Sequence, residues 1–268
     1  MSFFRVIIPA YNNVGTIERA IKSVMGQTFK DFELIVIDDC SEDGTYDKLV
    51  DLRKEFPFIL GANSLYFLGT EYPEKIFNGG TRNRAMNEMP NGLSRYVIFL
   101  DADDDFVGKN ILQELHDFIV ENDYPDMIRL PYIRHNIDGT TVDQTPNILR
   151  EQDIEDVAHS CRVACWTKAI KEELFEPFPE NTLCEDVCQH LKQCDVTETV
   201  AWFKKPVVNW YIRPDSTSNS YLDKWKSSCY RFVADLMDLK LEKSYTRARR
   251  DIKLANAIEN LRNGRWEQ

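Results

Sequence analysis

Mainly apolar runs of five or six residues alternate with segments of helical periodicity in the first hundred positions. Residues 4–8 and 32–37 are such runs, and each stops at proline or acidic residues, as a buried strand does. Between them, residues 16–25 carry apolar side chains at helical spacing, namely Ile17, Ala20, Ile21, Val24 and Met25. A strand, a helix and a strand in so short a stretch predict a parallel βαβ unit.

The same alternation continues to about residue 122. It predicts strands at 64–68 and 96–100, and helices within 41–55, at 83–88 and at 108–122. Strands that are apolar on both faces are typical of a parallel sheet covered by helices. The first half of the chain is therefore expected to form an open α/β sheet.

The pattern changes in the second half of the chain. Shorter strand-like pieces at 127–133, 200–203 and 207–211 are expected to complete a mixed sheet, with a turn at 136–139. From residue 221 onward, two stretches of helical periodicity follow. We expect one α/β domain over residues 1–220 and a C-terminal helical extension over residues 221–268.

Composition narrows the class of protein. The 268 residues are 43% hydrophobic, enough for a large core, and the net charge of −11 opposes nonspecific attraction to nucleic acid or anionic membranes. Residues 221–268 differ, with 11 Lys and Arg against 7 Asp and Glu. Neither an apolar run of membrane-spanning length nor an export signal is seen, so we expect a cytoplasmic protein whose seven cysteines are free thiols.

Polar residues gather where three of the expected strands end. These are residues 9–12 (PAYN), 38–39 (DD) and 101–105 (DADDD). In an open α/β sheet, ligands bind beyond the carboxyl ends of the strands. Four acids in five positions need a positive partner, and hard divalent ions such as Mg²⁺ or Mn²⁺ prefer oxygen ligands. The pattern favours a metal-held diphosphate, with a solvated acidic turn as the alternative.

Other motifs fit less well. Asp101, Asp103 and Asp105 have the spacing of a calcium-binding EF-hand loop, but Phe106 and Leu112 stand where that loop needs Gly and Glu. Neither a P-loop nor a dinucleotide-binding glycine pattern is present. Zinc is a further alternative, because several cysteines and histidines are close in sequence, although their i,i+4 spacing is equally that of buried helical residues: Cys161, Cys165, Cys184, Cys188, Cys194, His159 and His190.

Five segments, in order, resemble the inverting glycosyltransferases of family 2, which have the GT-A fold. VIIPAYNNVGTIERAIKSVMGQTFKDFELIVIDDCSEDGT is similar to the opening nucleotide-binding segment of that family, and GGTRNRAMN to its next motif, although Thr81 stands where Ala is common. YVIFLDADDDF resembles the D-x-D segment, LCEDVCQHL the Glu-Asp motif, and NWYIRPDSTS the closing Tyr-Arg-Ser stretch. The resemblance implies a GT-A fold, a Rossmann-like open mixed sheet flanked by helices, with the nucleotide-sugar-binding and catalytic domain in residues 1–220.

The resemblance also implies roles for particular residues. A pocket for the nucleotide base and ribose would be lined by Pro9, Ala10, Tyr11 and Asp39, with Arg82 and Asn83 beside it. Asp101 would contact the ribose or the metal's waters, and Asp103 would ligate the metal. Asp186 would be the general base, with Glu185 alongside. The alternative for Glu185 and Asp186 is an exposed face of a helix spanning residues 184–194.

These roles describe a metal-dependent transferase that moves a sugar from a UDP-sugar to an acceptor hydroxyl. A divalent ion stabilises the departing diphosphate, and a carboxylate takes the hydroxyl proton. The expected acceptor is a surface glycan, and hydroxymethylated bases of phage DNA are the alternative. A binding protein without turnover and a sugar nucleotidyltransferase are the rival classes. In the final helix, Ile252, Ala255, Ile258 and Leu261 are expected to face the body and leave the basic side chains in water.

Overall fold

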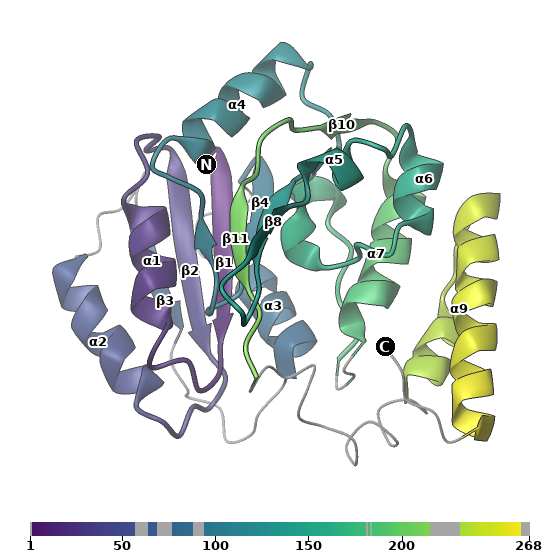
Figure 1. Ribbon diagram of the computed structural model, residues 1–268, viewed down its shortest axis with the longest axis horizontal. Helices are drawn as coiled ribbons and strands as arrows, with labels where there is room; N and C mark the ends of the chain where they lie inside the picture. Colours follow the sequence, from purple (N-terminus) through teal and green to yellow (C-terminus); the bar gives the residue numbers. More distant parts are fainter. Residues whose placement is uncertain are drawn as a thin grey trace.

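The computed structural model describes residues 2–56, 64–68, 77–87, 94–180, 182, 184–214 and 231–263. Within these residues, a seven-stranded sheet has the order β10-β6-β9-β4-β1-β2-β3 (Figure 1). Its strands are β1 (Phe4–Ala10), β2 (Phe32–Asp38), β3 (Ser64–Leu68), β4 (Tyr96–Phe99), β6 (Met127–Arg129), β9 (Lys168–Lys171) and β10 (Val200–Trp202). β9 alone among them runs antiparallel to its neighbours, so the sheet is mixed.

Helices flank this sheet. They are α1 (Ile17–Met25), α2 (Thr45–Glu55), α3 (Phe77–Asn87), α4 (Ile111–Glu121), α5 (Thr145–Ile148), α6 (Ile154–His159), α7 (Glu185–Val196) and α9 (Ser244–Asn263), with short 3₁₀ turns at Cys165–Thr167 and Glu172–Leu174. The expected mixed α/β sheet flanked by helices is confirmed.

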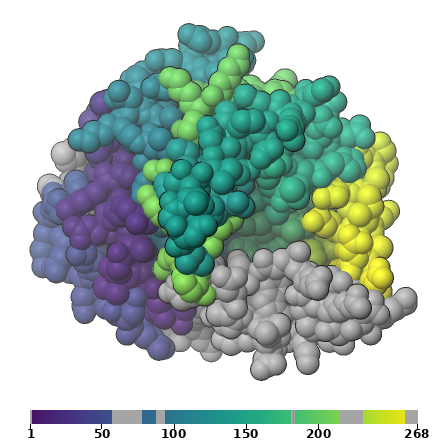
Figure 2. Space-filling view, viewed as in Figure 1, coloured from purple at the N-terminus to yellow at the C-terminus, as the bar shows by residue number. Residues whose placement is uncertain are grey.

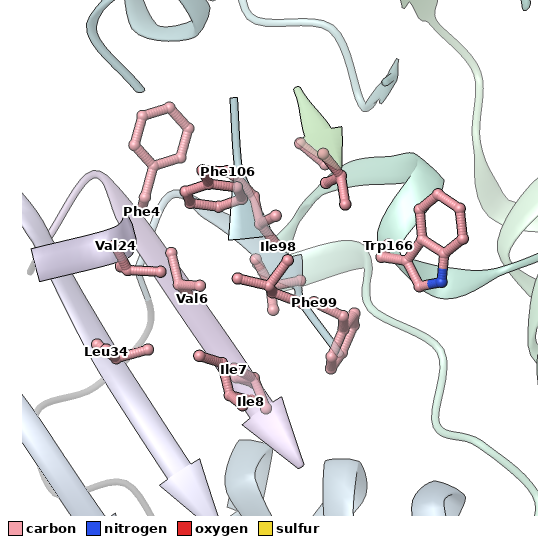
Figure 3. Packing of buried hydrophobic residues seen from close by; sticks show 14 of the residues in the cluster. Phe4, Val6, Ile7, Ile8, Val24, Leu34, Ile98, Phe99, Phe106 and Trp166 are labelled. Carbon is pink, nitrogen blue, oxygen red and sulfur yellow. The ribbon is translucent and has the colours of Figure 1, made fainter. Parts of the chain in front are cut away.

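The core lies where β1, β2 and β4 meet α1 (Figure 3). Every residue of β1 and β2 is buried, because helices cover the sheet on both faces. The buried positions of α1 are Ile17, Ala20, Ile21 and Val24, as the helical periodicity predicts. These strands are thus held rigidly from one end to the other, which fixes the residues that follow them.

A smaller sheet within the described residues has the order β5-β11-β7-β8. Its strands are β5 (Asp105–Phe106), β7 (Tyr132–His135), β8 (Thr141–Asp143) and β11 (Val208–Tyr211). The expected turn at 136–139 joins β7 to β8, and Gly139 adopts a positive φ of 83° there. The acidic segment 101–105 follows β4 of the large sheet and ends in β5 of the smaller sheet, so both sheets anchor it.

The structure corrects three sequence expectations. The piece 127–133 is split between the two sheets, because Pro131 lacks the amide hydrogen needed to continue the ladder. Helix α3 begins at Phe77 rather than at residue 83, since packing overrides the low helix propensity of Gly79 and Gly80. β9 was not expected at all, because a four-residue strand bounded by two lysines gives no strand signal.

The C-terminal extension packs on the body through helix α9, at the yellow edge of Figures 1 and 2. Residues 231–238 are also helical, whereas the expected start of that helix at residue 221 lies outside the described residues. Leu191 of α7, Phe232, Leu236 and Leu241 share a small apolar cluster. Among the described helices, none is long and apolar enough to cross a membrane.

The expected orientation of the final helix is wrong. Ile252 is 46% exposed and Ala255 is exposed, whereas Thr246 is buried and Arg249 and Arg250 are half-buried. Helix α9 meets α6 and α7 through this mixed face, and Thr246 donates to the carboxylate of Asp195 on α7 (2.6 Å). The apolar residues of α9 that pack on the cluster beside α7 are Leu254 and Ala257, while Ile258 is half-buried and the side chain of Leu261 lies outside the described residues.

A buried charge cluster ties the amino ends of the sheet together. Arg5 of β1 donates to Glu33 of β2 (2.8 Å) and is ion-paired with Glu172, which follows β9. The amide of Ser94 donates to the other oxygen of Glu172 (2.8 Å). Burial raises the pKa of Glu172 from its ordinary value of 4.5 to about 7, and Arg5 offsets this only in part.

This shift predicts how stability depends on pH. Because the folded pKa of Glu172 is raised, the folded state keeps a proton that the unfolded chain releases above pH 4.5. The free energy of unfolding of the wild type, measured relative to Glu172→Gln by urea denaturation, should therefore fall as pH rises from 4.5 to about 7. A difference that stays constant over this range would contradict the assignment.

Candidate active site

Three parallel strands deliver polar residues to one edge of the large sheet. Ala10 of β1 is in register with Asp38 of β2, and the amide of Asp39 donates to the carbonyl of Ala10 (2.8 Å). On the other side of β1, the amide of Leu100 donates to the carbonyl of Ile7 (3.0 Å). The strands β1 and β2 point downward in Figure 1, so this edge lies at the lower side of that view.

The residues expected to line the nucleotide pocket lie together at this edge. Pro9, Ala10 and Asp39 are buried, and Tyr11 is half-buried. The loops after β1 and β2 are tied to each other by Asn12, whose amide donates to the hydroxyl of Ser41 (2.9 Å) and whose side-chain oxygen accepts from the amide of Glu42 (2.9 Å). The two strand ends thus form one continuous polar rim.

Arg82 connects the acidic segment after β4 with the start of α7. Its guanidinium is 3% exposed and donates to Glu185 (2.9 Å) and to Asp101 (3.0 Å), and it lies 4.0 Å from Asp186. The ring of Phe178 covers it at 5.3 Å. A planar, permanently charged fork suits two carboxylates that come from different elements. The D-x-D segment and the Glu-Asp motif therefore meet through Arg82 of the motif GGTRNRAMN.

Gly79 permits this meeting. A side-chain Cβ at this position would lie 2.5 Å from the carbonyl oxygen of Pro179 and 3.2 Å from Cβ of Glu185. Helix α3 can approach the start of α7 only because position 79 has no side chain. Gly79 thus has a packing role.

Asn83 also lies beside the site, but its polar atoms are used by the backbone. Its amide nitrogen donates to the carbonyl of Phe178 (2.9 Å), and its oxygen accepts from the amide of Phe178 (2.8 Å). These bonds hold the segment that covers Arg82. The expected position of Asn83 near the nucleotide pocket remains a prediction.

Three carboxylates of the acidic segment converge. Asp101, Asp103 and Asp104 each offer an oxygen, and these oxygens lie within 4.8 Å of one another. Asp104 is 1% exposed, and one of its oxygens accepts from the amide of Tyr211 (2.9 Å) while the other has no hydrogen-bond partner. Burial raises the pKa of Asp104, and repulsion from Asp103 adds to this.

Burial disfavours the other negative charges as well. It raises the pKa of Asp101 to about 6 despite the nearby Arg82. It raises the pKa of Glu185 to about 8, where repulsion from Asp186 adds to the effect. The site therefore holds more negative charge than its own cations offset, which is the environment that a bound cation relieves.

The two acids at the start of α7 differ in access. The side chain of Glu185 is 8% exposed and bonded to Arg82, whereas that of Asp186 is 27% exposed. One oxygen of Asp186 is buried and accepts no hydrogen bond. Asp186 is thus the acid that a second substrate can reach, and the alternative of a fully exposed helix face does not apply to Glu185.

Two arginines that the sequence interpretation did not assign also hold the acidic segment. Arg213 pairs with Asp103 (2.8 Å), and Arg19 of α1 pairs with Asp105 (2.9 Å). Arg19 also stacks on the ring of Tyr211 at 4.1 Å. Arg213 lies in the quoted closing motif, which could have revealed it, whereas Arg19 belongs to a helix face that gives no such signal.

The cysteines do not assemble a zinc site within the described part of the chain. Each cysteine there is a free thiol, as expected. The acidic trio is the only cluster of metal-ligating side chains that these residues form. Cys165, Cys188 and Cys194 are instead buried among apolar side chains.

A family model supports the interpretation of these motifs. The model described as glycosyl transferase family 2 matches residues 5–157. The chain belongs to this family. The match includes the pocket residues, Arg82 and the acidic segment, and it ends before α7.

Related family 2 sequences come from several bacteria. Glycosyltransferase GlyA of Streptococcus pneumoniae is 25% identical over 259 residues, which are 90% of this chain and 35% of GlyA. The UDP-Glc:alpha-D-GlcNAc-diphosphoundecaprenol beta-1,3-glucosyltransferase WfaP of Escherichia coli is 34% identical over 116 residues, which are 43% of this chain and 41% of WfaP. The matched segments thus cover less than half the length of each of these two relatives.

Solved glycosyltransferase structures share the fold. The structure of S. aureus TarS 1-349 in complex with UDP-GlcNAc has a TM-score of 0.70 at 22% identity, covering 96% of this chain and 72% of that one. The mannosyltransferase PcManGT from Pyrobaculum calidifontis, in complex with GDP-Man and Mn²⁺, has a TM-score of 0.62 at 16% identity, covering 97% and 70%. The GT-A fold is therefore confirmed.

The packing at Gly79 predicts a specific defect. Gly79→Ala should destabilise the protein by about 1–3 kcal/mol, because the methyl group meets backbone that cannot move aside, and this outweighs the better helix propensity of Ala. Gly15→Ala is the matched control, since nothing lies within 4 Å of its added carbon. Chemical denaturation measures both, and equal stabilities of the two variants would contradict the close approach of α3 to α7.

Proposed function

We propose that the chain is a metal-dependent inverting glycosyltransferase that moves a sugar from a UDP-sugar to a hydroxyl of a surface glycan. The observation that carries this proposal is the bridge from Arg82 to Asp101 and Glu185, which brings the acidic segment within reach of Asp186. Residues 1–220 would be the catalytic domain, and residues 221–268 an extension that supports α7.

The donor proposal rests on the polar rim and on relatives. Pro9, Ala10, Tyr11 and Asp39 lie at the ends of β1 and β2, the position where nucleotides bind in open α/β sheets. TarS is described in complex with UDP-GlcNAc and with UDP, and WfaP is named for UDP-Glc. These names favour uridine diphosphate over other carriers.

The residues present fit a divalent metal ion. Asp101, Asp103 and Asp104 supply only oxygen atoms, which Mg²⁺ and Mn²⁺ prefer, and the unpartnered oxygen of Asp104 is buried beside them. Asp103 would be the main ligand, with Asp101 contacting the ribose or the ion's waters. When bound, the ion stabilises the negative charge of the departing diphosphate. Arg213 occupies one oxygen of Asp103, so ion and arginine would share or compete for this carboxylate.

Asp186 is the proposed general base. It takes the proton of the acceptor hydroxyl as that oxygen bonds to the anomeric carbon from the side opposite the diphosphate. The bond between the anomeric carbon and the diphosphate oxygen breaks, and its electron pair leaves with UDP. Glu185 would hold Arg82 and so keep Asp186 in place, rather than accept the proton itself.

The acceptor proposal follows the relatives. WfaP is named for a glycan carried on diphosphoundecaprenol, and TuaG of Bacillus subtilis for teichuronic acid biosynthesis. The DNA alternative drew on the basic residues of the C-terminal extension. In the structure, Arg247 donates to the carbonyl of Leu241 (3.2 Å) and Arg250 to that of Leu239 (3.2 Å). Arg250 is thereby half-buried while Arg247 stays exposed, and within the described residues no contact favours nucleic acid.

Metal removal is the first test. EDTA should abolish release of UDP from UDP-sugars, and Mn²⁺ or Mg²⁺ should restore it, because the acidic trio otherwise repels the diphosphate. Asp103→Asn should lower turnover about 10²-fold or more, while Asp51→Asn, at an exposed position on α2, serves as the charge-matched control. Full activity in chelator would rule out the metal role of Asp103.

A second test separates the base from the binding residues. Asp186→Asn keeps the shape but removes the proton acceptor, so turnover should fall about 10²-fold or more with donor affinity nearly unchanged. Asp39→Ala should mainly weaken donor binding, measured by calorimetry with UDP. Equal loss of donor binding in both variants would show that the roles are misassigned, and tight binding with no turnover by the wild type on any acceptor would favour a binding protein.

A further inference from the structure

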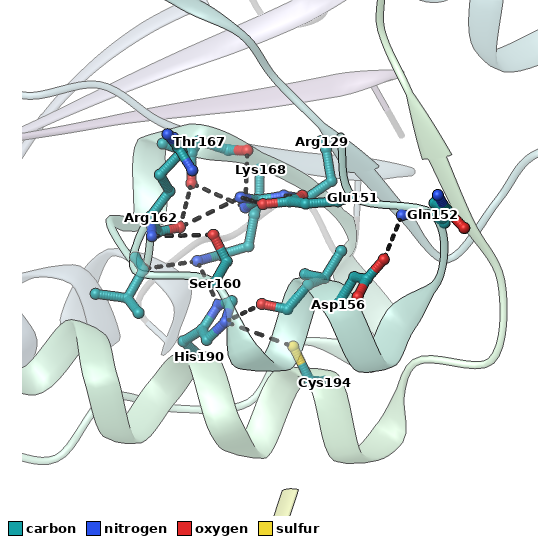
Figure 4. Close-up of polar contacts among 12 residues, drawn as sticks. Arg129, Glu151, Gln152, Asp156, Ser160, Arg162, Thr167, Lys168, His190 and Cys194 are labelled. Atoms are coloured by element: carbon teal, nitrogen blue, oxygen red, sulfur yellow. Dashed lines mark hydrogen bonds and ion pairs between the residues drawn. The ribbon is translucent and has the colours of Figure 1, made fainter. Parts of the chain in front are cut away.

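A buried polar cluster lies where α7 faces β6, β9 and the segment 160–167 (Figure 4). We call it the Lys168 cluster; its members are Arg129, Glu151, Lys168, His190 and Cys194. Lys168, Arg129 and His190 are each at most 1% exposed. Burying two cations costs free energy unless hydrogen bonds or opposite charges offset their loss of contact with water. None of these residues takes part in the proposed chemistry directly.

Each donor of Lys168 has an acceptor. Its ammonium lies 2.7 Å from the carbonyl oxygen of Val163, 3.2 Å from that of Ala164, and 3.2 Å from Nδ1 of His190. On the other side of the ring, Nε2 of His190 lies 2.9 Å from the carbonyl oxygen of Val157. An ammonium can only donate and a carbonyl can only accept, so His190 must be neutral with its hydrogen on Nε2.

The position of His190 makes this network relevant to the site. It follows Asp186 by four residues on α7, so both side chains lie on one face of the helix, about 6 Å apart along its axis. His190 bonds to β9 through Lys168 and to α6 through Val157. The network therefore fixes the distance and rotation of α7 relative to the large sheet, at one turn from Asp186.

The charges in the cluster are unequal. Arg129 is neutralised by Glu151 through two bonds of 2.8 and 3.0 Å, whereas no described carboxylate lies within ion-pair distance of Lys168. Burial, together with the charge of Arg129, lowers the pKa of Lys168 to about 8, while Asp186 opposes this shift. Burial and the charges of Lys168, Arg129 and Arg249 of α9 lower the pKa of His190. The excess positive charge therefore resides on Lys168.

We propose that Lys168 is a positioning residue for sugar transfer: its bond to His190 seats α7 on the sheet, one turn from Asp186. This inference rests on the proposed role of Asp186 as general base. A base must be held within hydrogen-bond reach of the proton that it takes, so the seating of α7 decides whether Asp186 can act.

The proposal gives the reaction an upper pH limit. When Lys168 loses its proton, the amine keeps only two donors for three acceptors, so the connection that seats α7 weakens. The turnover number should therefore fall as pH rises through about 8. The other ionisable groups that act on Lys168 are Arg129 of β6, Cys165 of the 3₁₀ turn, and Asp186, His190 and Cys194 of α7. Burial raises the pKa of both thiols and lowers the pKa of His190.

The first experiment uses Lys168→Met with Lys171→Met as its matched control. Both lysines lie on β9, but Lys171 pairs with Asp126 and does not reach α7. Lys168→Met should lower kcat about 10-fold or more, leave the donor KM within about twofold, and abolish the decline above pH 8. Lys171→Met should keep both kcat and the decline. Equal kcat and pH profiles in the two variants would overturn the proposal.

The second experiment changes the other partner. His190→Gln retains an acceptor and a donor and should keep kcat within about threefold, whereas His190→Leu should lose as much as Lys168→Met. The double variant Lys168→Met/His190→Leu should be no worse than either single one, because both break one connection. Additive losses, or a His190→Leu variant with wild-type kcat, would contradict the network. This series also decides the matter if Lys168→Met does not fold.

A spectroscopic measurement is independent of any donor or acceptor. In protein labelled with ¹⁵N-histidine, the His190 resonances, assigned by their loss in His190→Gln, should show the Nε2–H tautomer and shift at Nδ1 as pH passes about 8. A His190 signal that does not change between pH 7 and 9 would overturn the link to Lys168. If this signal and the variants behave as expected but Asp186→Asn remains active, the proposed base fails instead.

Discussion

The buried guanidinium of Arg82 is the interaction on which the rest of the site depends. It binds Asp101 from the end of β4 and Glu185 from the first turn of α7, two elements that are 84 positions apart in the chain. Without a cation between them, these carboxylates would repel each other, and Glu185 would be left buried without a partner of opposite charge. The position of Asp186, and with it the proposed base, follows from this single bridge and from the close approach that Gly79 allows.

The two sheets and the Lys168 cluster hold the acidic segment and the start of α7 at this bridge. The large sheet fixes the strand ends from one side, because β1, β2 and β4 are buried along their whole length. The small sheet fixes the acidic segment from the other side, where Asn209 donates to Asp105 (2.6 Å) and Tyr211 to Asp104 (2.9 Å). The Lys168 cluster then joins α7 to β9 and α6. The Lys168 cluster is polar and buried, so it specifies one geometry at the cost of stability.

Much of this arrangement could be predicted from the sequence. Apolar runs and helical periodicity located β1, α1, β2, β4 and α4, because their burial follows local patterns. The strand ends then predicted that residues 9–11, 38–39 and 101–105 would meet. Long-range pairs could not be predicted in this way. The bridges from Arg82 to Glu185 and from Arg213 to Asp103 link positions more than 100 residues apart, and only the resemblance placed the motifs in one site.

Elements that break local rules were missed. β9 carries Lys168 into the core, and Gly79 lies inside a helix, because tertiary packing compensates for both. The predicted orientation of α9 was wrong for the same reason, since Thr246 and Arg250 form hydrogen bonds that helical periodicity does not reveal. Each of the first two positions adjoins the helix that carries Asp186.

The central claim is a single displacement at the anomeric carbon, with Asp186 as base. The most direct measurement is the anomeric configuration of the first sugar product, followed by ¹H NMR during turnover of an α-linked UDP-sugar with water or an alcohol as acceptor. The account predicts that the β-anomer forms first and that Asp186→Asn forms it far more slowly. Initial formation of the α-anomer would contradict the single displacement and the role assigned to Asp186.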